Sequence, residues 1–141
     1  MKRTLEIIFI FLISITPLFA DQPLDFLGVF EAQAKSENPA FSRFSVNNGE
    51  QFFKTQHGGD WSCSSCHTIN PSEIGKHVVT QKAIQPLAPI ANSERFTDSA
   101  KVDKWFKRNC KDVVNRECTA QEKGDVLTYL LSLDKSLRPL P

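Results

Sequence analysis

Methionine is almost absent from this chain of 141 residues, because the one methionine is Met1, at the first position. A metal site that needs a thioether ligand is therefore excluded. Histidine is scarce as well, with three residues, and the formal net charge is only +1. A chain without a marked excess of basic residues lacks the electrostatic footprint of nucleic-acid binding, which argues against that class of partner. No internal repeat or low-complexity stretch is present, and the composition is that of an ordinary globular protein.

The first twenty residues have the layout of a secretory signal peptide. Two basic residues precede an apolar run from Ile7 to Ile15, and the segment ends on the small residue Ala20. The apolar run is about half of the roughly 20 residues that span a bilayer, which favours a cleaved signal over a retained anchor. We therefore expect cleavage near Ala20, a periplasmic mature chain of residues 21–141, and no stable membrane insertion after cleavage.

Two helices are predicted in the first part of the mature chain. The first would run from Pro23 to about Ser36, because proline suits the first turn of a helix and apolar residues recur at helical spacing. Its expected apolar side consists of Phe26, Val29, Phe30 and Ala34. Ser45 would cap the second helix, which would run to about Gln56. The first helix would be an extension that precedes the core of the domain.

A long segment without a helical pattern follows. Residues 57–97 hold glycine, proline and polar residues without sustained periodicity. A loop of about forty residues is abnormal in a compact domain unless it wraps something. A third helix would begin at Thr97 or Asp98 and run to about Asn109. No part of the pattern indicates a sheet.

The last predicted helix begins with a capping box. Thr119 and Glu122 have the spacing in which each side chain bonds the backbone of the other residue. The apolar side of the helix is expected to consist of Val126, Leu127, Leu130 and Leu131. Four helices and one long loop make a thin core, which a flat apolar cofactor at the centre would complete.

The motif C-x-x-C-H occurs at Cys63, Cys66 and His67, and it is the attachment site of c-type haem. The two thiols would add to the porphyrin vinyl groups, and the histidine would be the proximal iron ligand. A thioredoxin-like dithiol would need a βαβ pattern, which is absent. A zinc site would need a second closely spaced pair, whereas seven residues separate Cys110 from Cys118. We therefore expect one covalent haem c.

The ligand on the other face of the iron decides between electron transfer and ligand binding. His57 and His77 are close in sequence to His67 and would more easily lie on the proximal side or at the haem rim. Asn109 follows His67 by 42 residues, a separation that suits a distal ligand. It continues an apolar helical stripe formed by Val102, Trp105 and Phe106. The pattern alone allows two interpretations, an amide that caps the helix end and an amide whose oxygen coordinates iron.

A resemblance to a known family bears on this choice. Residues 105–110 (WFKRNC), residues 116–119 (RECT) and Glu122-Lys123 resemble the signature of the sphaeroides haem protein family, which are high-spin, oxygen-binding relatives of class I cytochromes c. Four further segments also resemble that family: Cys63–Thr68, Gly75–His77, Pro86–Ala88 and Arg95–Asp98. The resemblance extends from about Phe41 to Leu133. One difference is Asn115, where glycine is common in the family.

This resemblance implies a fold, a ligand and a function. The fold would be the all-α class I cytochrome c fold, with residues 21–141 as one monohaem domain. Asn109 would be the sixth iron ligand in the oxidised state and would leave on reduction, which opens the iron to O₂, NO or CO. An oxidase-like or NO-converting activity is compatible with that chemistry. The alternatives are a plain electron shuttle with a permanent sixth ligand, and a gas sensor or scavenger.

The remaining predictions concern the surroundings of this site. Cys110 and Cys118 are expected to form a disulfide in an exported protein, which would tie the ligand-bearing helix to the last helix. The electron donor would be another cytochrome, and the resemblance implies a dihaem cytochrome c. A basic stripe is either a solvated face or a surface that steers an acidic partner; it consists of Lys101, Lys104, Arg108 and Lys111. Candidate haem or propionate contacts are Arg43, Trp61, Lys76, His77 and Lys82.

Overall fold

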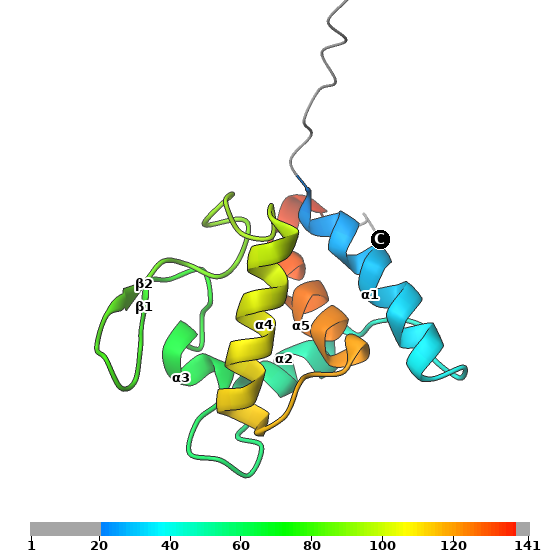
Figure 1. The fold of residues 1–141 in the computed structure, drawn as a ribbon. Helices are drawn as coiled ribbons and strands as arrows, with labels where there is room; N and C mark the ends of the chain where they lie inside the picture. The colour runs from blue at the N-terminus through cyan, green and yellow to red at the C-terminus, as the bar shows by residue number, and fades with distance from the viewer. Residues whose placement is uncertain (1–20, 138–141) are drawn as a thin grey trace, which may run out of the picture.

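The structure is a computed structural model that describes residues 21–137, so the predicted signal peptide lies outside the described residues. Its elements are α1 (Pro23–Glu37), α2 (Val46–Lys54), α3 (Cys63–His67), β1 (Gly75–Lys76), β2 (Ala83–Ile84), α4 (Ser99–Val114), α5 (Ala120–Ser132) and the 3₁₀ turn η1 (Lys135–Leu137). Figure 1 shows α4 crossing in front of α5, with α1 on one side and the β1–β2 hairpin on the other. Within residues 21–137, no helix combines the length and the apolar character needed to cross a membrane.

The predicted helix starts are confirmed, and each has a local cause. The Ser45 hydroxyl accepts the Asn48 backbone N–H at 3.2 Å, and the Asp98 carboxylate accepts the Lys101 N–H at 3.0 Å. The Thr119 hydroxyl accepts the Glu122 N–H at 3.2 Å in the predicted capping box. Side chains of this kind satisfy backbone donors that have no partner inside the helix.

Two of the predicted helix ends are wrong. α2 ends at Lys54, two residues before the predicted position. α4 continues past Asn109 to Val114, because Val113 is buried and continues the apolar stripe. Asn115 follows with φ 56°, a left-handed conformation that terminates the helix and that asparagine tolerates.

The core lies where α5 packs against α2 and α1. Phe53, Leu127 and Leu130 are fully buried at this junction. A Cβ added at Gly49 would overlap the Asp125 carbonyl, so the backbones of α2 and α5 approach one another as closely as glycine allows. Phe30 of α1 packs on Leu127, as predicted for the apolar side of that helix. The prediction for Val29 is wrong, since that side chain is 52% exposed.

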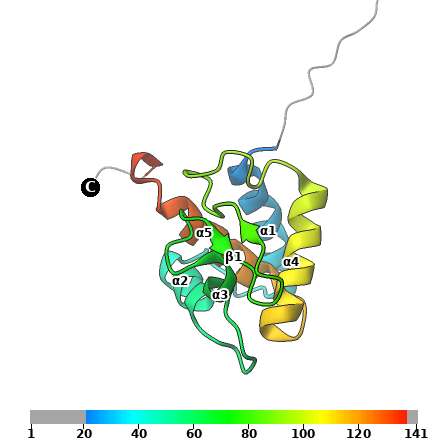
Figure 2. The same cartoon turned by 90° about the vertical axis from the view of Figure 1, so that its left-hand side faces the viewer.

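The segment between α2 and α4 is more regular than predicted. It contains the short helix α3 and a two-stranded antiparallel hairpin in which Gly75 pairs with Ile84 and Lys76 with Ala83. The expectation that no sheet is present is therefore wrong, although the strands are only two residues long. Short-range backbone bonding makes this hairpin, and no alternating apolar pattern announces it in the sequence. Figure 2 shows α3 and β1 on the face nearest the viewer, with α2 on one side and α4 on the other.

Hydrogen bonds within the segment hold its second half. The backbone N–H groups of Leu87 and Ala88 both donate to the Pro71 carbonyl, at 2.9 and 3.0 Å. The Arg95 guanidinium donates to the carbonyls of Gln85 at 2.7 Å and Pro86 at 2.9 Å. Arg95 thereby closes a loop across ten residues. Sequence reasoning did not single out Arg95 for any role.

α4 stands apart from the other helices. Close backbone packing joins α5 to α2 and α1, whereas α4 has no comparable approach to any other described helix. Its contacts with α1 and α5 are made by apolar side chains: Val102 joins the cluster of Phe26, Phe30 and Leu127, and the ring of Phe106 meets that of Phe30 edge-on at 5.7 Å. The separation leaves α4 attached chiefly by its inner side chains and its two ends.

Candidate functional site

α3 presents the two cysteines of the C-x-x-C-H motif. Cys63 and Cys66 are three residues apart, so they lie on one side of a helix. The Ser62 N–H donates to the Ser65 hydroxyl at 2.9 Å, which supports the first turn. Neither Cys63 nor Cys66 is in a disulfide. Burial raises the pKa of the Cys63 thiol to about 12, so this group is a neutral thiol at physiological pH.

His67 ends α3 as a neutral imidazole. Burial, together with the nearby positive charge of Arg95, lowers the pKa of His67 to about 4. Its buried Nδ1 atom has no hydrogen-bond partner among the described residues. The ring lies near that of Phe53, with 6.4 Å between the ring centroids. A neutral imidazole is the form that binds metals, and an unpaired buried nitrogen calls for a partner.

The backbone around His67 is tightly constrained. Thr68 follows with φ 62° and ψ 166°, a conformation that a β-branched residue rarely adopts. Gly75 of β1 packs against α3, and a Cβ there would overlap the Cys66 carbonyl and lie 3.1 Å from the His67 Cα. Strained residues persist where the surrounding structure over-determines them, and they cluster at functional sites. The hairpin thus packs closely against the backbone of α3 at Cys66 and His67 and restricts its position.

Asn109 lies inside α4, five residues before the last residue of the helix. The interpretation that it caps the helix end is therefore wrong. The side chain is half-buried, and its amide makes no hydrogen bond to any residue in the range 21–137. Val102 on the same stripe is buried, but Trp105 is 44% exposed, so the stripe is open on the Trp105 side. The amide is available to a ligand that is not part of the chain.

The other two histidines are engaged locally. The Nε2 atom of His57 lies 2.9 Å from the Phe52 carbonyl oxygen, and its ring packs on that of Phe52 at 4.3 Å. The Nδ1 atom of His77 accepts the backbone N–H groups of Val79 and Thr80, at 3.2 and 3.3 Å. One ring nitrogen of each histidine thus contacts backbone nearby in the sequence, that of Phe52 in α2 for His57 and that of the hairpin loop for His77.

The other candidate haem contacts lie on loops and on the hairpin. Arg43, Lys76 and Lys82 are exposed, and Trp61 is half-buried in the loop before α3. Their role towards propionates stays a prediction. Arg95 is the basic side chain whose charge acts on His67, and half-burial lowers the pKa of its guanidinium. The signal for Arg95 lay in residues 95–98, which belong to the resemblance described above.

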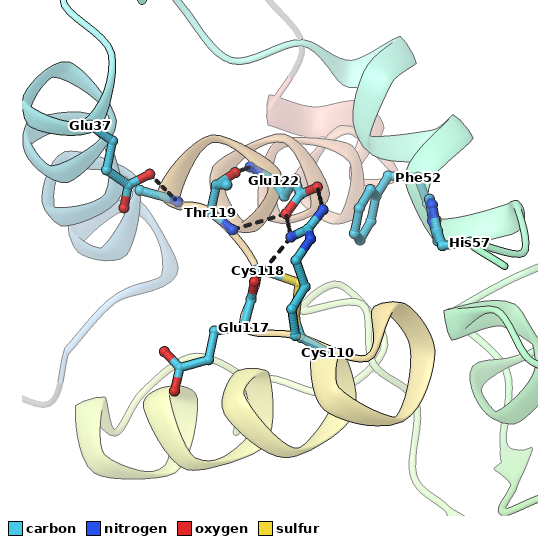
Figure 3. A network of polar contacts seen from close by, with 10 residues as sticks. Glu37, Phe52, His57, Cys110, Glu117, Cys118, Thr119 and Glu122 are labelled. Carbon is cyan, nitrogen blue, oxygen red and sulfur yellow. Dashed lines mark hydrogen bonds and ion pairs between the residues drawn. A yellow bond between two sulfur atoms is a disulfide. The ribbon is translucent and has the colours of Figure 1, made fainter. Parts of the chain in front are cut away.

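The predicted disulfide between Cys110 and Cys118 is present, with 5.6 Å between the Cα atoms. Arg116, in the same turn, donates to both carboxylate oxygens of Glu122 at 2.7 Å. Glu122 also accepts the Thr119 N–H, and the Ala120 N–H donates to Glu37 of α1 at 3.0 Å. Figure 3 shows the disulfide beside these contacts. The residue after Asn109 is therefore bonded to a turn that is itself tied to α5 and α1.

This cluster predicts a pH dependence of stability. Burial favours the neutral form of Glu122, but the hydrogen bonds from Arg116 and from the Thr119 backbone outweigh it, so the pKa of Glu122 lies below its ordinary value of 4.5. A lowered carboxyl pKa stabilises the fold above the unfolded-state pKa, and that contribution is lost as pH falls through the folded-state value. Because Arg116 is 52% exposed, we expect Glu122→Gln to cost only about 0.5 to 1 kcal/mol near neutral pH.

The measurement is urea unfolding of the wild type and of Glu122→Gln from about pH 7 to about pH 3. The difference in free energy of unfolding should shrink on the acid side. Glu117→Gln, which removes a more exposed carboxylate from the same turn, serves as the control. A difference for Glu122→Gln that stays constant across the range would contradict the role given to its charge.

Comparisons with known proteins identify the family. A family model described as a domain of unknown function (DUF1924) matches residues 39–130. Cytochrome c'' of Methylophilus methylotrophus is 42% identical over 106 residues, which are 72% of this chain and 74% of that protein. The cytochrome c-type protein SHP of Cereibacter sphaeroides is 48% identical over 82 residues, 56% of this chain and 63% of that protein. The chain belongs to this family of c-type cytochromes.

Solved structures of the same two proteins support the fold. Oxidised SHP, described as an oxygen-binding cytochrome c, superposes with a TM-score of 0.71 at 35% identity, over 80% of this chain and 98% of that one. The solution structure of cytochrome c'', a study of haem-ligand detachment, gives a TM-score of 0.70 at 36% identity, over 78% of this chain and 92% of that one. The all-α cytochrome c fold predicted from the sequence is confirmed, and so is the resemblance to the sphaeroides haem protein family, of which SHP is the member compared.

As a member of this family, the protein is a c-type cytochrome with one covalently attached haem, as the sequence predicted. The described residues fit this group. α3 offers two thiols outside any disulfide and a neutral imidazole with an unpaired nitrogen. Among the described residues, large apolar side chains are exposed in the segment that follows α3, namely Ile69, Ile74, Val79 and Ile90. A covalently attached haem accounts for the free thiols and for the unpaired imidazole nitrogen of α3.

Proposed function

We propose that this cytochrome binds diatomic gases in its reduced state, with Asn109 as a ligand that is lost on reduction. Cys63 and Cys66 hold the haem, and His67 is its proximal ligand. The observation that carries the proposal is the side chain of Asn109: a half-buried amide inside α4, without a hydrogen-bond partner in residues 21–137. His57 and His77, the rival donors, each use one ring nitrogen in a contact with backbone nearby in the sequence.

The chemistry of the amide explains why reduction would release it. When bound, haem supplies an iron centre that exchanges one electron and binds small ligands where a coordination position is open. A neutral amide oxygen is a hard, weak donor, which suits the ferric state better than the softer ferrous state. Asn109 would therefore close the distal position only in the oxidised protein. After release, its amide N–H groups would stay close enough to donate a hydrogen bond to a bound gas.

The relatives support this direction. SHP is described as an oxygen-binding cytochrome c, and cytochrome c'' as a protein whose haem ligand detaches. In this chain Asn109 directly precedes Cys110, the first cysteine of the disulfide. We propose the same behaviour here, in an exported, periplasmic protein that receives its electron from another cytochrome, a dihaem cytochrome c being the candidate.

Optical spectra of the purified holoprotein in both oxidation states, with and without CO, test the proposal. We expect CO to change the Soret band of the reduced protein within mixing time and to leave the oxidised protein unaltered. An electron shuttle with a permanent sixth ligand would give the same reduced spectrum with and without CO. That result would reject gas binding and leave electron transfer as the function.

A further inference from the structure

Beside Asn109, at the open edge of the apolar stripe of α4, lies an exposed tryptophan enclosed by two cations. Trp105 is 44% exposed. The Lys104 ammonium lies 5.6 Å from its ring centroid and the Arg108 guanidinium 5.7 Å. Both distances are within the range of cation–π attraction, which holds the long basic side chains against the ring. We call Lys104, Trp105 and Arg108 the α4 patch.

The positive charge of the α4 patch is not cancelled locally. Lys101 pairs with Asp98 at 3.3 Å and Lys107 with Glu117 at 3.4 Å. Within residues 21–136, no carboxylate forms an ion pair with Lys104 or Arg108. The whole chain has a formal charge of only +1, whereas α4 alone has five basic and two acidic residues. The basic charge is thus concentrated on this helix and is not a property of the whole surface.

The α4 patch lies next to the proposed distal ligand. Trp105 precedes Asn109 by four residues, so the two side chains are neighbours one turn apart on the helix. A protein seated on Trp105 would therefore lie beside the position from which Asn109 acts. Such a location suits a partner that delivers an electron, because electron transfer needs close approach.

We propose that the α4 patch is the docking surface for an acidic redox protein, a c-type cytochrome with carboxylates around its own exposed haem edge. This inference rests on the proposed function, because it takes Asn109 to mark the haem. Unpaired Lys104 and Arg108 complement the carboxylates and steer the encounter, and Trp105 supplies the apolar contact at the centre. Asp103 and Asp112 interrupt the basic residues along α4. A continuous cationic track with several stacking rings, as single-stranded nucleic acid requires, is therefore not formed by this helix.

The test measures binding of the ferric holoprotein to a purified acidic c-type cytochrome by isothermal titration calorimetry at low and at high salt. We expect salt-sensitive binding, and a rise in Kd of about tenfold or more in the double variant Lys104→Glu/Arg108→Glu. Trp105→Ala should also weaken binding, with less change in the salt dependence. The control is Lys35→Glu, which reverses one charge on α1 and is compared with the single variant Lys104→Glu; it should leave Kd within about twofold.

Several outcomes would overturn the docking surface. One is equal weakening by Lys35→Glu, which would assign the effect to overall charge. Another is wild-type affinity in the double variant, and a third is tighter binding to phosphatidylglycerol vesicles or single-stranded DNA than to the acidic cytochrome. The CO spectrum of the double variant separates this inference from the proposed function. CO binding should be unchanged there, whether or not docking is lost.

Discussion

Replacement of Asn109 by alanine is expected to change the oxidised protein and spare the reduced one. Alanine removes the amide oxygen, so the ferric spectrum should shift towards that of a haem with water or no sixth ligand. The reduced variant should bind CO as the wild type does, because the proposal has the amide leave the iron in that state. Stability should not fall from a lost helix contact, since alanine favours a helix interior by up to about 0.7 kcal/mol.

Asn109→His is expected to change the reduced protein, which Asn109→Ala should spare. Imidazole binds both oxidation states of haem iron, so the reduced protein should become low-spin. If imidazole occupies the iron in nine of ten reduced molecules, the apparent affinity for CO falls about tenfold. Asn47→Ala, the same truncation at an exposed position of α2, is the matched control for the alanine variant. An unchanged ferric spectrum in Asn109→Ala would show that another group is the ligand.

Gly75→Ala is expected to damage the haem site through backbone overlap. The new Cβ would overlap the Cys66 carbonyl and crowd the His67 Cα, both of which are backbone atoms of α3. Neither atom can move without shifting the helix that bears the C-x-x-C-H motif. Overpacking of this kind costs about 1 to 3 kcal/mol. We expect a lower yield of haem-loaded protein, scored by the ratio of Soret to protein absorbance, and a lower free energy of unfolding.

Gly28→Ala provides the matched control. Gly28 lies in α1, and a Cβ there meets no atom within 4 Å. The same change of side chain should therefore stabilise the protein by about 0.5 to 1 kcal/mol, since alanine favours a helix more than glycine does. If both variants load haem to the same extent, the close approach of β1 to α3 does not affect haem attachment.

The helix starts were predictable from the sequence because a cap acts over three residues. Ser45, Asp98 and Thr119 each bond a backbone N–H in the first turn of the helix that they precede. The end of α4 was not predictable in this way. It depends on the burial of Val113 in the folded chain and on the disulfide between Cys110 and Cys118. The predicted end at Asn109 mattered for the site, because a helix that ended there would have allowed the Asn109 amide to act as a helix cap.

The cofactor was predictable because its attachment motif is contiguous. Cys63, Cys66 and His67 lie within five residues, and the relatives confirm one covalent haem. The surroundings of the motif come from remote pairs. Arg95 bonds the carbonyls of Gln85 and Pro86, and Pro71 accepts two N–H groups from beyond the hairpin. No local pattern encodes such pairings, so the long segment appeared irregular from its sequence. The role of Asn109 stays a prediction.

The disulfide that anchors the C-terminal part of α4 has a kinetic consequence for a ligand proposed to detach. Asn109 lies in the hydrogen-bonded interior of the helix, and the neighbouring Cys110 is bonded to Cys118. Its main chain is therefore held, so an amide that leaves the iron as proposed would do so by turning about its side-chain torsions. Side-chain rotations take picoseconds to nanoseconds where they are unhindered, whereas shifts of whole helices take microseconds to milliseconds. Exchange between closed and open forms should consequently be limited by breaking of the bond to iron and not by slow movement of the protein.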